Sequence, residues 1–227
     1  MECFNVSAMV NKRKMMGLLE KIKYKLNIYR RYRYWKKQRC IFIHVPKVAG
    51  TSINRALYGK TLGHYSALEV KDIFPELFAN CFVFSFVRNP WDRALSAYNF
   101  AKVGATDTMA VYNNQQYNNE KFRTFEAFVK EWLPEQNINS LDFIFQPQSK
   151  FLFDSKGKCL VNFIGKLETI NKDLMIVEER MGRQLSLSHE NKTSSGSSYR
   201  EFYKDKEMIK IIGKLYEKDV KNFNYQF

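Results

Sequence analysis

One lysine and two hydroxyl residues lie where a short apolar run meets the start of a predicted helix. Lys47 lies four residues after the apolar residues 41–43, and Gly50, Thr51 and Ser52 begin three residues after it. The free N–H groups at the start of a helix point toward one spot, where the helix dipole favours negative charge. A lysine and two hydroxyls at that spot would bind a phosphate-like anion. Because ligands of open α/β sheets bind outside the carboxyl ends of strands, we expect this site at a strand end.

This segment differs from the common nucleotide-binding loop. In that loop the lysine directly follows the second of two glycines. Here Lys47 precedes Gly50 by three residues, and no glycine stands where the loop would need its first one. The shorter loop suits one phosphate and a neighbouring group better than a triphosphate. The alternative is a plain strand-turn-helix corner in which Lys47 is solvated.

A second corner follows the apolar and aromatic run at residues 81–87, which has the length of a buried strand. Arg88 ends this run. Pro90 suits the first position of a helix and Asp92 its first turn, so that Ser96 falls near the second turn. An arginine fork and a hydroxyl suit a second phosphate. The two corners together predict a ligand with two separated anionic groups.

Both corners resemble those of sulfotransferases that use 3′-phosphoadenosine 5′-phosphosulfate (PAPS). The resemblance is to the branch of carbohydrate sulfotransferases that includes the heparan 2-O and chondroitin enzymes and bacterial relatives. Residues 44–52 resemble the 5′-phosphosulfate loop of that family, and residues 86–98 resemble its 3′-phosphate segment. Weaker similarities extend the resemblance over about residues 40–227; they lie at residues 142–151, 163–168, 191–194 and 203–223.

The resemblance implies a role for each of these residues. Sulfuryl transfer moves SO₃ in line between two oxygens, much as phosphoryl transfer does. Lys47 would stabilise charge on the leaving phosphate, and Arg88 and Ser96 would hold the 3′-phosphate. The full donor-binding set that the resemblance implies is Lys47, Ala49, Gly50, Thr51, Ser52, Ile53, Arg88, Ser96, Lys192 and Ser194. The family needs no metal for catalysis, and the sequence has no metal-ligand spacing such as HExxH or paired CxxC.

An acceptor hydroxyl needs a base near neutral pH, and histidine is the usual choice. The chain has three, His44, His64 and His189. His64 lies in a glycine-marked loop after the first predicted helix and resembles the catalytic histidine of the family; the alternative is an ordinary exposed loop histidine. His44 ends the first strand, where we favour a structural role. His189 lies in a polar stretch from which it could contact the donor.

Apolar runs that alternate with helical patterns predict an α/β fold, specifically a P-loop-like three-layer fold with a central parallel sheet flanked by helices. A short apolar run at residues 160–165 predicts a third strand. Thr169 is predicted to cap a helix that Gly182 ends. Residues 104–121 are polar and rich in Asn and Gln, which predicts a mobile insertion over the cleft, where acceptor contacts often lie. The remaining helices are predicted at residues 51–58, within 66–78, and at 91–103, 124–133 and 205–220.

Charge divides the chain into a basic N-terminal arm, residues 1–39, and a sulfotransferase domain, residues 40–227. The arm carries a net charge of +10 out of +14 for the whole chain. Its apolar residues recur at helical spacing: Met15, Leu18, Leu19, Ile22, Leu26 and Tyr29. A basic amphipathic helix indicates peripheral contact with a membrane surface; a helix docked on the domain with a solvated basic face is the alternative.

The cysteines and the hydropathy indicate a compartment. Cys40 and Cys81 fall at predicted strand starts and look like small buried residues, and the chain is poor in cysteine for its length, which favours a reducing compartment. No stretch is apolar enough for a membrane span or a signal peptide. The eukaryotic enzymes of this branch are membrane-anchored Golgi proteins, so we expect instead a bacterial, cytoplasmic enzyme, peripheral at the inner membrane face.

The sequence therefore predicts a sulfotransferase that moves a sulfuryl group from PAPS to a hydroxyl of a carbohydrate or another acceptor, with His64 as the base. One alternative is an ATP- or GTP-dependent kinase, which would leave the Arg88–Ser96 pair unused. Another is a basic module that binds membranes or nucleic acid, although most of the charge lies outside the domain with both corners. We expect no nucleic-acid partner, and the sequence makes no prediction of oligomeric state.

Overall fold

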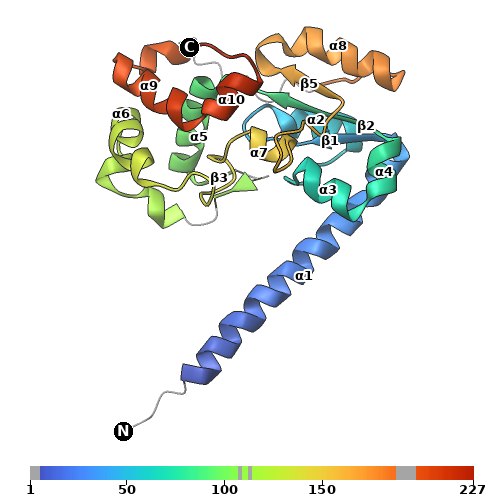
Figure 1. Cartoon of the computed structure of the whole chain (residues 1–227), viewed down its shortest axis with the longest axis horizontal. Helices are drawn as coiled ribbons and strands as arrows, with labels where there is room; N and C mark the ends of the chain where they lie inside the picture. Colours follow the sequence, from blue (N-terminus) through green and yellow to red (C-terminus); the bar gives the residue numbers. More distant parts are fainter. Residues whose placement is uncertain (1–5, 107–108, 112–113, 188–197) are drawn as a thin grey trace.

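A small parallel sheet lies at the centre of the molecule (Figure 1). A computed structural model describes residues 6–106, 109–111, 114–187 and 198–227. The sheet contains β1 (Cys40–Ile43), β2 (Phe82–Val87) and β5 (Phe163–Lys166), in the order β1-β2-β5. Both neighbouring pairs run parallel. The predicted α/β fold with a parallel sheet flanked by helices is confirmed.

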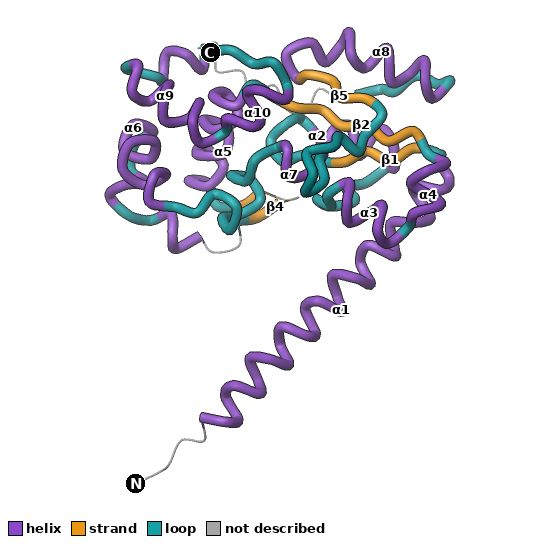
Figure 2. Tube along the Cα trace, in the orientation of Figure 1, coloured by secondary structure: helices purple, strands orange, loops and turns teal. Residues whose placement is uncertain are grey.

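Helices cover the sheet and extend the fold to either side. Their bounds are α1 (Val6–Gln38), α2 (Gly50–Tyr58), α3 (Ala67–Ile73), α4 (Pro75–Asn80), α5 (Pro90–Val103), α6 (Phe125–Ala127), α7 (Ser149–Leu152), α8 (Ile170–Met181), α9 (Lys206–Leu215) and α10 (Glu217–Asn222). Helix α8 packs on β2 and β5, while α1 packs on β1 and α2. In Figure 2, α5, α6 and α9 gather on the side of the molecule opposite α3 and α4.

The register of β1 and β2 places their carboxyl ends side by side. Ile43, the last residue of β1, pairs with Ser85, and the Ser85 hydroxyl donates to the Ile43 carbonyl at 2.7 Å. Both strands are almost entirely buried, as their apolar runs predict. The two corners that follow β1 and β2 therefore open at the same edge of the sheet, where α/β folds bind their ligands.

The predicted third strand is present as β5, but it begins at Phe163 rather than at Leu160. The preceding residues pair elsewhere: Cys159 forms a bridge with Phe153, and the Leu160 N–H donates to the Leu152 carbonyl. An apolar pattern alone does not distinguish these two pairings, because both bury the same side chains.

Most helix boundaries follow the predicted capping residues. Pro90 occupies the first turn of α5 and Gly182 ends α8 with a φ of 65°, both as predicted; in addition, the Thr124 hydroxyl caps α6. Thr169 precedes α8 but does not cap it, since its hydroxyl donates to the Asp173 carboxylate at 2.7 Å. The helix predicted at residues 205–220 is two helices, α9 and α10, which meet at Tyr216.

The polar segment at residues 104–121 contains short regular elements. Strands β3 (Ala105–Thr106) and β4 (Met109–Ala110) pair antiparallel. Short 3₁₀ turns follow in this segment and elsewhere, at Asn114–Tyr117, Glu120–Phe122, Leu133–Glu135, Leu167–Thr169 and Tyr199–Phe202, with a π turn at Phe128–Trp132. Tyr117 anchors the segment, because its buried ring contacts Phe122, Trp132 and Phe145.

Helix α1 extends well beyond the domain, as Figure 1 shows, and only its last turns pack on it. Ile28 and Trp35 are buried in the core, and the Tyr24 hydroxyl reaches Glu69 of α3. In contrast, Leu26 and Tyr29 are 53% and 57% exposed. No helix in the described part of the chain is long and apolar enough to cross a membrane.

Candidate active site

The loop between β1 and α2 has the backbone geometry of an anion cradle. Lys47 and Ala49 both have positive φ, 69° and 59°. Alternation of left-handed residues with ordinary ones turns successive N–H groups toward one side, which forms an anion-binding nest. Among the described residues, no backbone acceptor outside the helices takes up the N–H groups of residues 49–52. These donors and the α2 dipole converge where the sequence predicts a phosphate.

Gly50 is required in this loop for steric reasons. A Cβ at Gly50 would lie 2.0 Å from the ring of His44, so the first turn of α2 rests directly on that imidazole. The His44 ring is buried, and its Nδ1 accepts a hydrogen bond from the Asn54 amide nitrogen at 3.1 Å. Burial holds the pKa of His44 well below its usual range. His44 thus acts as a neutral support for the loop, the structural role that the sequence favours.

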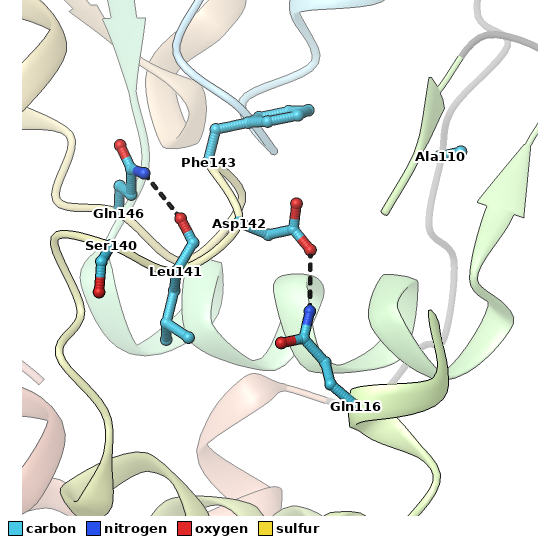
Figure 3. Close-up of a pocket in the computed structure, with 7 residues that line it drawn as sticks. All are labelled: Ala110, Gln116, Ser140, Leu141, Asp142, Phe143 and Gln146. Carbon is cyan, nitrogen blue, oxygen red and sulfur yellow. Dashed lines mark hydrogen bonds between the residues drawn. The ribbon is translucent and has the colours of Figure 1, made fainter. Parts of the chain in front are cut away.

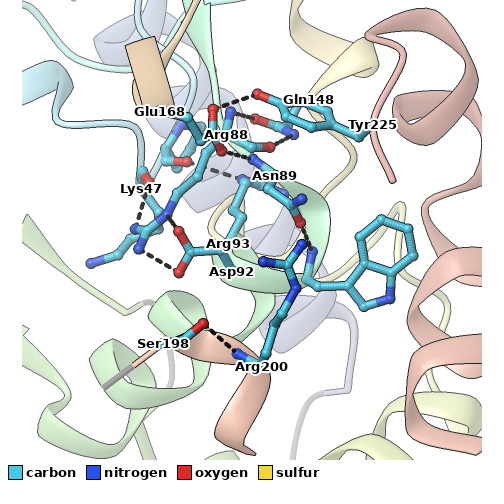
Figure 4. Close-up of polar contacts among 12 residues, drawn as sticks. Lys47, Arg88, Asn89, Asp92, Arg93, Gln148, Glu168, Ser198, Arg200 and Tyr225 are labelled. Atoms are coloured by element: carbon cyan, nitrogen blue, oxygen red, sulfur yellow. Dashed lines mark hydrogen bonds and ion pairs between the residues drawn. The ribbon is translucent and has the colours of Figure 1, made fainter. Parts of the chain in front are cut away.

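The second corner is joined to the first by Arg88 (Figure 4). Its guanidinium forms a bidentate pair with Asp92, with both N···O distances 2.7 Å, and its Nη1 donates to the Lys47 carbonyl at 3.3 Å. The five N–H groups of an arginine fork leave two for a ligand after these three bonds. Ser96 lies one turn beyond Asp92 on α5, half-buried. The first turns of α5 therefore position both Arg88 and Ser96.

Lys47 is a half-buried cation among other cations. Burial and the neighbouring charges of Arg88 and Arg93 lower its pKa to about 8. Its ammonium lies 4.3 Å from the centre of the Phe100 ring, and no carboxylate of the described residues pairs with it. An anion bound here would relieve this repulsion and keep Lys47 charged. The electrostatics of the corner therefore favour a negatively charged ligand.

The remaining predicted donor residues fall into three groups. Thr51 is half-buried and Ser52 buried in the first turn of α2. Ile53 lies in the core, and its N–H is 3.5 Å from the Ala49 carbonyl, so it faces away from the loop. His189, Lys192 and Ser194 lie outside the described residues.

His64 lies close to the β1–α2 loop, oriented by one backbone hydrogen bond. Its Nδ1 is 2.9 Å from the His44 carbonyl, which can only accept, so Nδ1 carries the proton and Nε2 has a free lone pair. Its ring lies 4.0 Å from that of His44 and 4.6 Å from that of Phe143. Burial lowers the pKa of His64 to about 4. It is neutral at physiological pH, as a base must be.

Arg93 is a site residue that sequence reasoning did not identify. It is fully buried, and its Nε donates to the Pro46 carbonyl at 3.1 Å. Its Nη2 donates to the carbonyls of Ile144 and Gln146 at 3.1 and 2.8 Å. One side chain thus joins the loop before Lys47 to the segment at residues 144–146. Nothing in the sequence distinguishes this arginine from a solvated helix residue.

Three side chains, of which Gln148 and Asp219 are buried, hold the loops around the β2–α5 corner in place. The Gln148 amide exchanges hydrogen bonds with the backbone N–H and carbonyl of Arg88, at 2.9 and 2.8 Å. Asp219 accepts from the N–H groups of Gln148 and Ser149, which begins α7. Glu168 accepts from the Asn89 N–H and the Tyr225 hydroxyl (Figure 4). Residues distant in the sequence therefore hold the β2–α5 corner.

A cavity of about 600 Å³ is lined in part by Phe143, whose ring contacts that of His64 (Figure 3). Its lining residues are Ala110, Gln116, Ser140, Leu141, Asp142, Phe143 and Gln146. Asp142 accepts from the Tyr117 hydroxyl at 2.6 Å and from Gln116 at 3.4 Å. Because Phe143 contacts both His64 and this cavity, the cavity adjoins the candidate base.

Comparisons with known proteins identify a family. A family model described as "Sulfotransferase family" matches residues 30–226. The match includes both corners, His64 and the residues that line the cavity. No curated protein and no solved structure matches the chain.

Proposed function

This chain belongs to the sulfotransferase family, and we propose that it moves a sulfuryl group from PAPS to a hydroxyl of a carbohydrate acceptor. The family itself implies PAPS as the donor. One observation carries the assignment of the site: the corners after β1 and β2 open at adjacent strand ends and contact each other through Arg88 and Lys47. A ligand with two anionic groups suits this arrangement.

The hydrogen-bond donors of the two corners suit a nucleotide with a 5′-phosphosulfate and a 3′-phosphate. The N–H groups of residues 49–52 and the hydroxyls of Thr51 and Ser52 would hold the 5′ group. The two remaining N–H groups of Arg88 and the Ser96 hydroxyl would hold the 3′-phosphate. Asp92 would keep the Arg88 fork in place for that contact.

The catalytic work divides between two side chains. Lys47 would stabilise the negative charge that grows on the leaving phosphate, and a bound anion would raise its pKa and keep it protonated. His64 would take the proton of the acceptor hydroxyl at Nε2, because Nδ1 is held by the His44 carbonyl. We propose that this chemistry needs no metal.

A transfer assay with two labelled donors tests the proposal against the kinase alternative. The purified chain is incubated with a mixture of small glycosides and either ³⁵S-labelled PAPS or γ-³²P-labelled ATP with Mg²⁺. We expect label transfer or donor turnover from PAPS alone, unchanged by EDTA. Transfer from ATP and none from PAPS would support a kinase instead.

The basic arm supports a second proposal, that α1 contacts an anionic membrane surface at its cytoplasmic face. Ile22, Leu26 and Tyr29 share one helix face and are 45%, 53% and 57% exposed. Lysines and arginines surround them, which suits acidic lipid headgroups. The free thiols Cys40 and Cys81 are consistent with a reducing compartment.

Vesicle sedimentation tests this second proposal. We expect the full chain to sediment with vesicles containing phosphatidylglycerol, less so at high salt, and not with pure phosphatidylcholine. The Ile22→Ser/Leu26→Ser double variant should bind at least several-fold more weakly, since both side chains are largely exposed, 45% and 53%. Equal binding of the variant, or no salt dependence, would contradict the proposal.

A further inference from the structure

Residues 224–227, which we call the corner strap, lead the chain from the end of α10 to the corner that follows β2. Asn224 has a φ of 51°, in the left-handed region, and the Tyr225 N–H donates to the Val220 carbonyl at 3.0 Å. A left-handed residue at this place ends a helix and turns the chain away from the helix axis. The side chain of Tyr225 is thereby placed beside Glu168, as Figure 4 shows.

Hydrogen bonds connect the corner strap to Asn89, the first residue after the arginine of the corner. The Asn89 side-chain amide donates to the Gln226 carbonyl at 2.9 Å. The Asn89 N–H donates to one oxygen of Glu168 at 2.5 Å, and the other oxygen accepts from the Tyr225 hydroxyl at 2.8 Å. Asn89 is buried, and its side-chain oxygen caps α5. These bonds therefore act on the start of α5.

Aromatic packing holds the last residue of the strap against the same helix start. The centre of the Phe227 ring lies 5.7 Å from that of Trp91 and 5.2 Å from that of Tyr203, both edge to face. Aromatic rings prefer this arrangement at such separations. Trp91 is buried in the first turn of α5, and its carbonyl accepts from the Tyr203 hydroxyl at 2.8 Å. The strap thus contacts the first turn of α5 as well as the residue that caps it.

The position of the Arg88 guanidinium depends on these same groups. The peptide bond between Arg88 and Asn89 is held on both sides, because its carbonyl accepts from the Gln148 amide and its N–H donates to Glu168. At the other end of the side chain, the guanidinium pairs with Asp92 in the first turn of α5. The corner strap therefore supports both the backbone and the helix turn that orient the arginine fork.

We propose that Tyr225 and Phe227 are positioning residues for the donor, which hold the β2–α5 corner so that Arg88 selects a nucleotide with a 3′-phosphate. The proposal rests on the donor site proposed above and adds two residues to it from a distant part of the sequence. A binding side chain must be held to within roughly 0.5 Å of its productive position by the contacts around it. Loss of the strap contacts should therefore weaken recognition of the 3′-phosphate more than recognition of the rest of the nucleotide.

Calorimetric titrations with 3′-phosphoadenosine 5′-phosphate and with AMP test the proposal in the full chain. Tyr225→Phe removes only the hydroxyl, so it should weaken binding of the bisphosphate by roughly fivefold and leave binding of AMP within about twofold of the wild type. Phe227→Ala removes the ring contacts and should change the two affinities in the same way.

Tyr24→Phe is the matched control. It also removes a hydrogen bond from a tyrosine hydroxyl to a glutamate, the 2.6 Å contact with Glu69, but between α1 and α3. It should leave both affinities unchanged. The melting temperature of each variant, measured alongside, shows what fraction of the protein is folded at the temperature of the titration.

A double variant separates positioning from a general loss of structure. In Arg88→Ala protein, the further change Tyr225→Phe should have no effect on bisphosphate affinity, because the side chain through which it acts is absent. The same fold-loss in both backgrounds would show that Tyr225 acts independently of Arg88 and would overturn the inference.

The outcomes also separate this inference from the proposed function. Equal binding of the bisphosphate and AMP by the wild type would contradict the donor site itself. A preference for the bisphosphate in the wild type that persists undiminished in both Tyr225→Phe and Phe227→Ala would overturn the role of the strap and leave the donor site standing.

Discussion

The corners after β1 and β2 present backbone N–H groups and cationic side chains, whereas the cavity beside His64 presents amides, a hydroxyl, one carboxylate and an aromatic ring. The corners are built at the ends of adjacent strands of a regular sheet. The cavity is built from turns and short segments that Arg93 and Tyr117 hold together. A donor that never changes suits the rigid corners, and an acceptor that differs between enzymes suits the irregular cavity.

This contrast predicts separable effects. Changes in the corners should alter transfer to every acceptor, changes in the cavity should alter the choice of acceptor, and only the residues that join the two regions should alter both. His64 and Arg93 are the residues that join them, because each contacts backbone or rings on both sides.

The largest effect is expected from His64→Gln. Loss of a general base lowers kcat by roughly 10²- to 10⁴-fold, while glutamine can still donate to the His44 carbonyl. The affinity for 3′-phosphoadenosine 5′-phosphate, measured by calorimetry, should stay the same. Turnover near the wild-type rate would show that another group takes the proton.

Lys47→Ala tests the corner alone. Removal of one preorganised charge-stabilising donor lowers kcat by roughly 10²- to 10³-fold, and the loss should be the same for every acceptor. Lys71→Ala, at an exposed position on α3, is the matched control and should leave kcat unchanged. A loss of kcat in Lys47→Ala that differs between acceptors would contradict the view that the corners do not influence the choice of acceptor.

Arg93→Met tests the connection between the two regions. The change leaves three backbone carbonyls and the buried Asp219 without their cation, so the free energy of unfolding should fall by about 3 kcal/mol. Urea unfolding measures this loss. In protein that remains folded, both donor and acceptor affinities should weaken; a loss confined to one of them would mean that the regions are independent.

The smallest effect is expected in the pH dependence of kcat/KM for PAPS. Lys47 is charged below its pKa of about 8, and His64 is neutral above its pKa of about 4. The kcat/KM for PAPS should therefore be level from pH 5 to about pH 7, reach half its maximum near pH 8 and fall about tenfold per pH unit above that. Lys47→Arg should abolish the fall above pH 8, since its guanidinium does not lose its proton in this range.

The two regions also differ in how far the sequence predicts them. Lys47, Arg88 and Ser96 were predicted because strand ends and helix starts are local patterns, and the register of β1 and β2 brings those patterns together. The pairing of Arg88 with Asp92 was not predicted, although an i, i+4 spacing on α5 permits it.

The sequence predicts acceptor contacts in the segment at residues 104–121, which supplies Ala110 and Gln116, but it does not predict the cavity itself, for a physical reason. Gln116 and Asp142 meet only because Tyr117 packs into an aromatic cluster, which is a contact between distant segments. Likewise, the role of Arg93 depends on its burial, and no pattern around it distinguishes a buried arginine from an exposed one. Side chains that act through tertiary contacts leave no local signal.

Calorimetric titration of the wild type and Arg88→Ala, with 3′-phosphoadenosine 5′-phosphate and with AMP, tests the central claim that both corners form one donor site. We predict that the wild type prefers the bisphosphate by at least tenfold without Mg²⁺, and that Arg88→Ala binds the two nucleotides equally. Equal binding by the wild type, or a preference that survives in Arg88→Ala, would contradict the account.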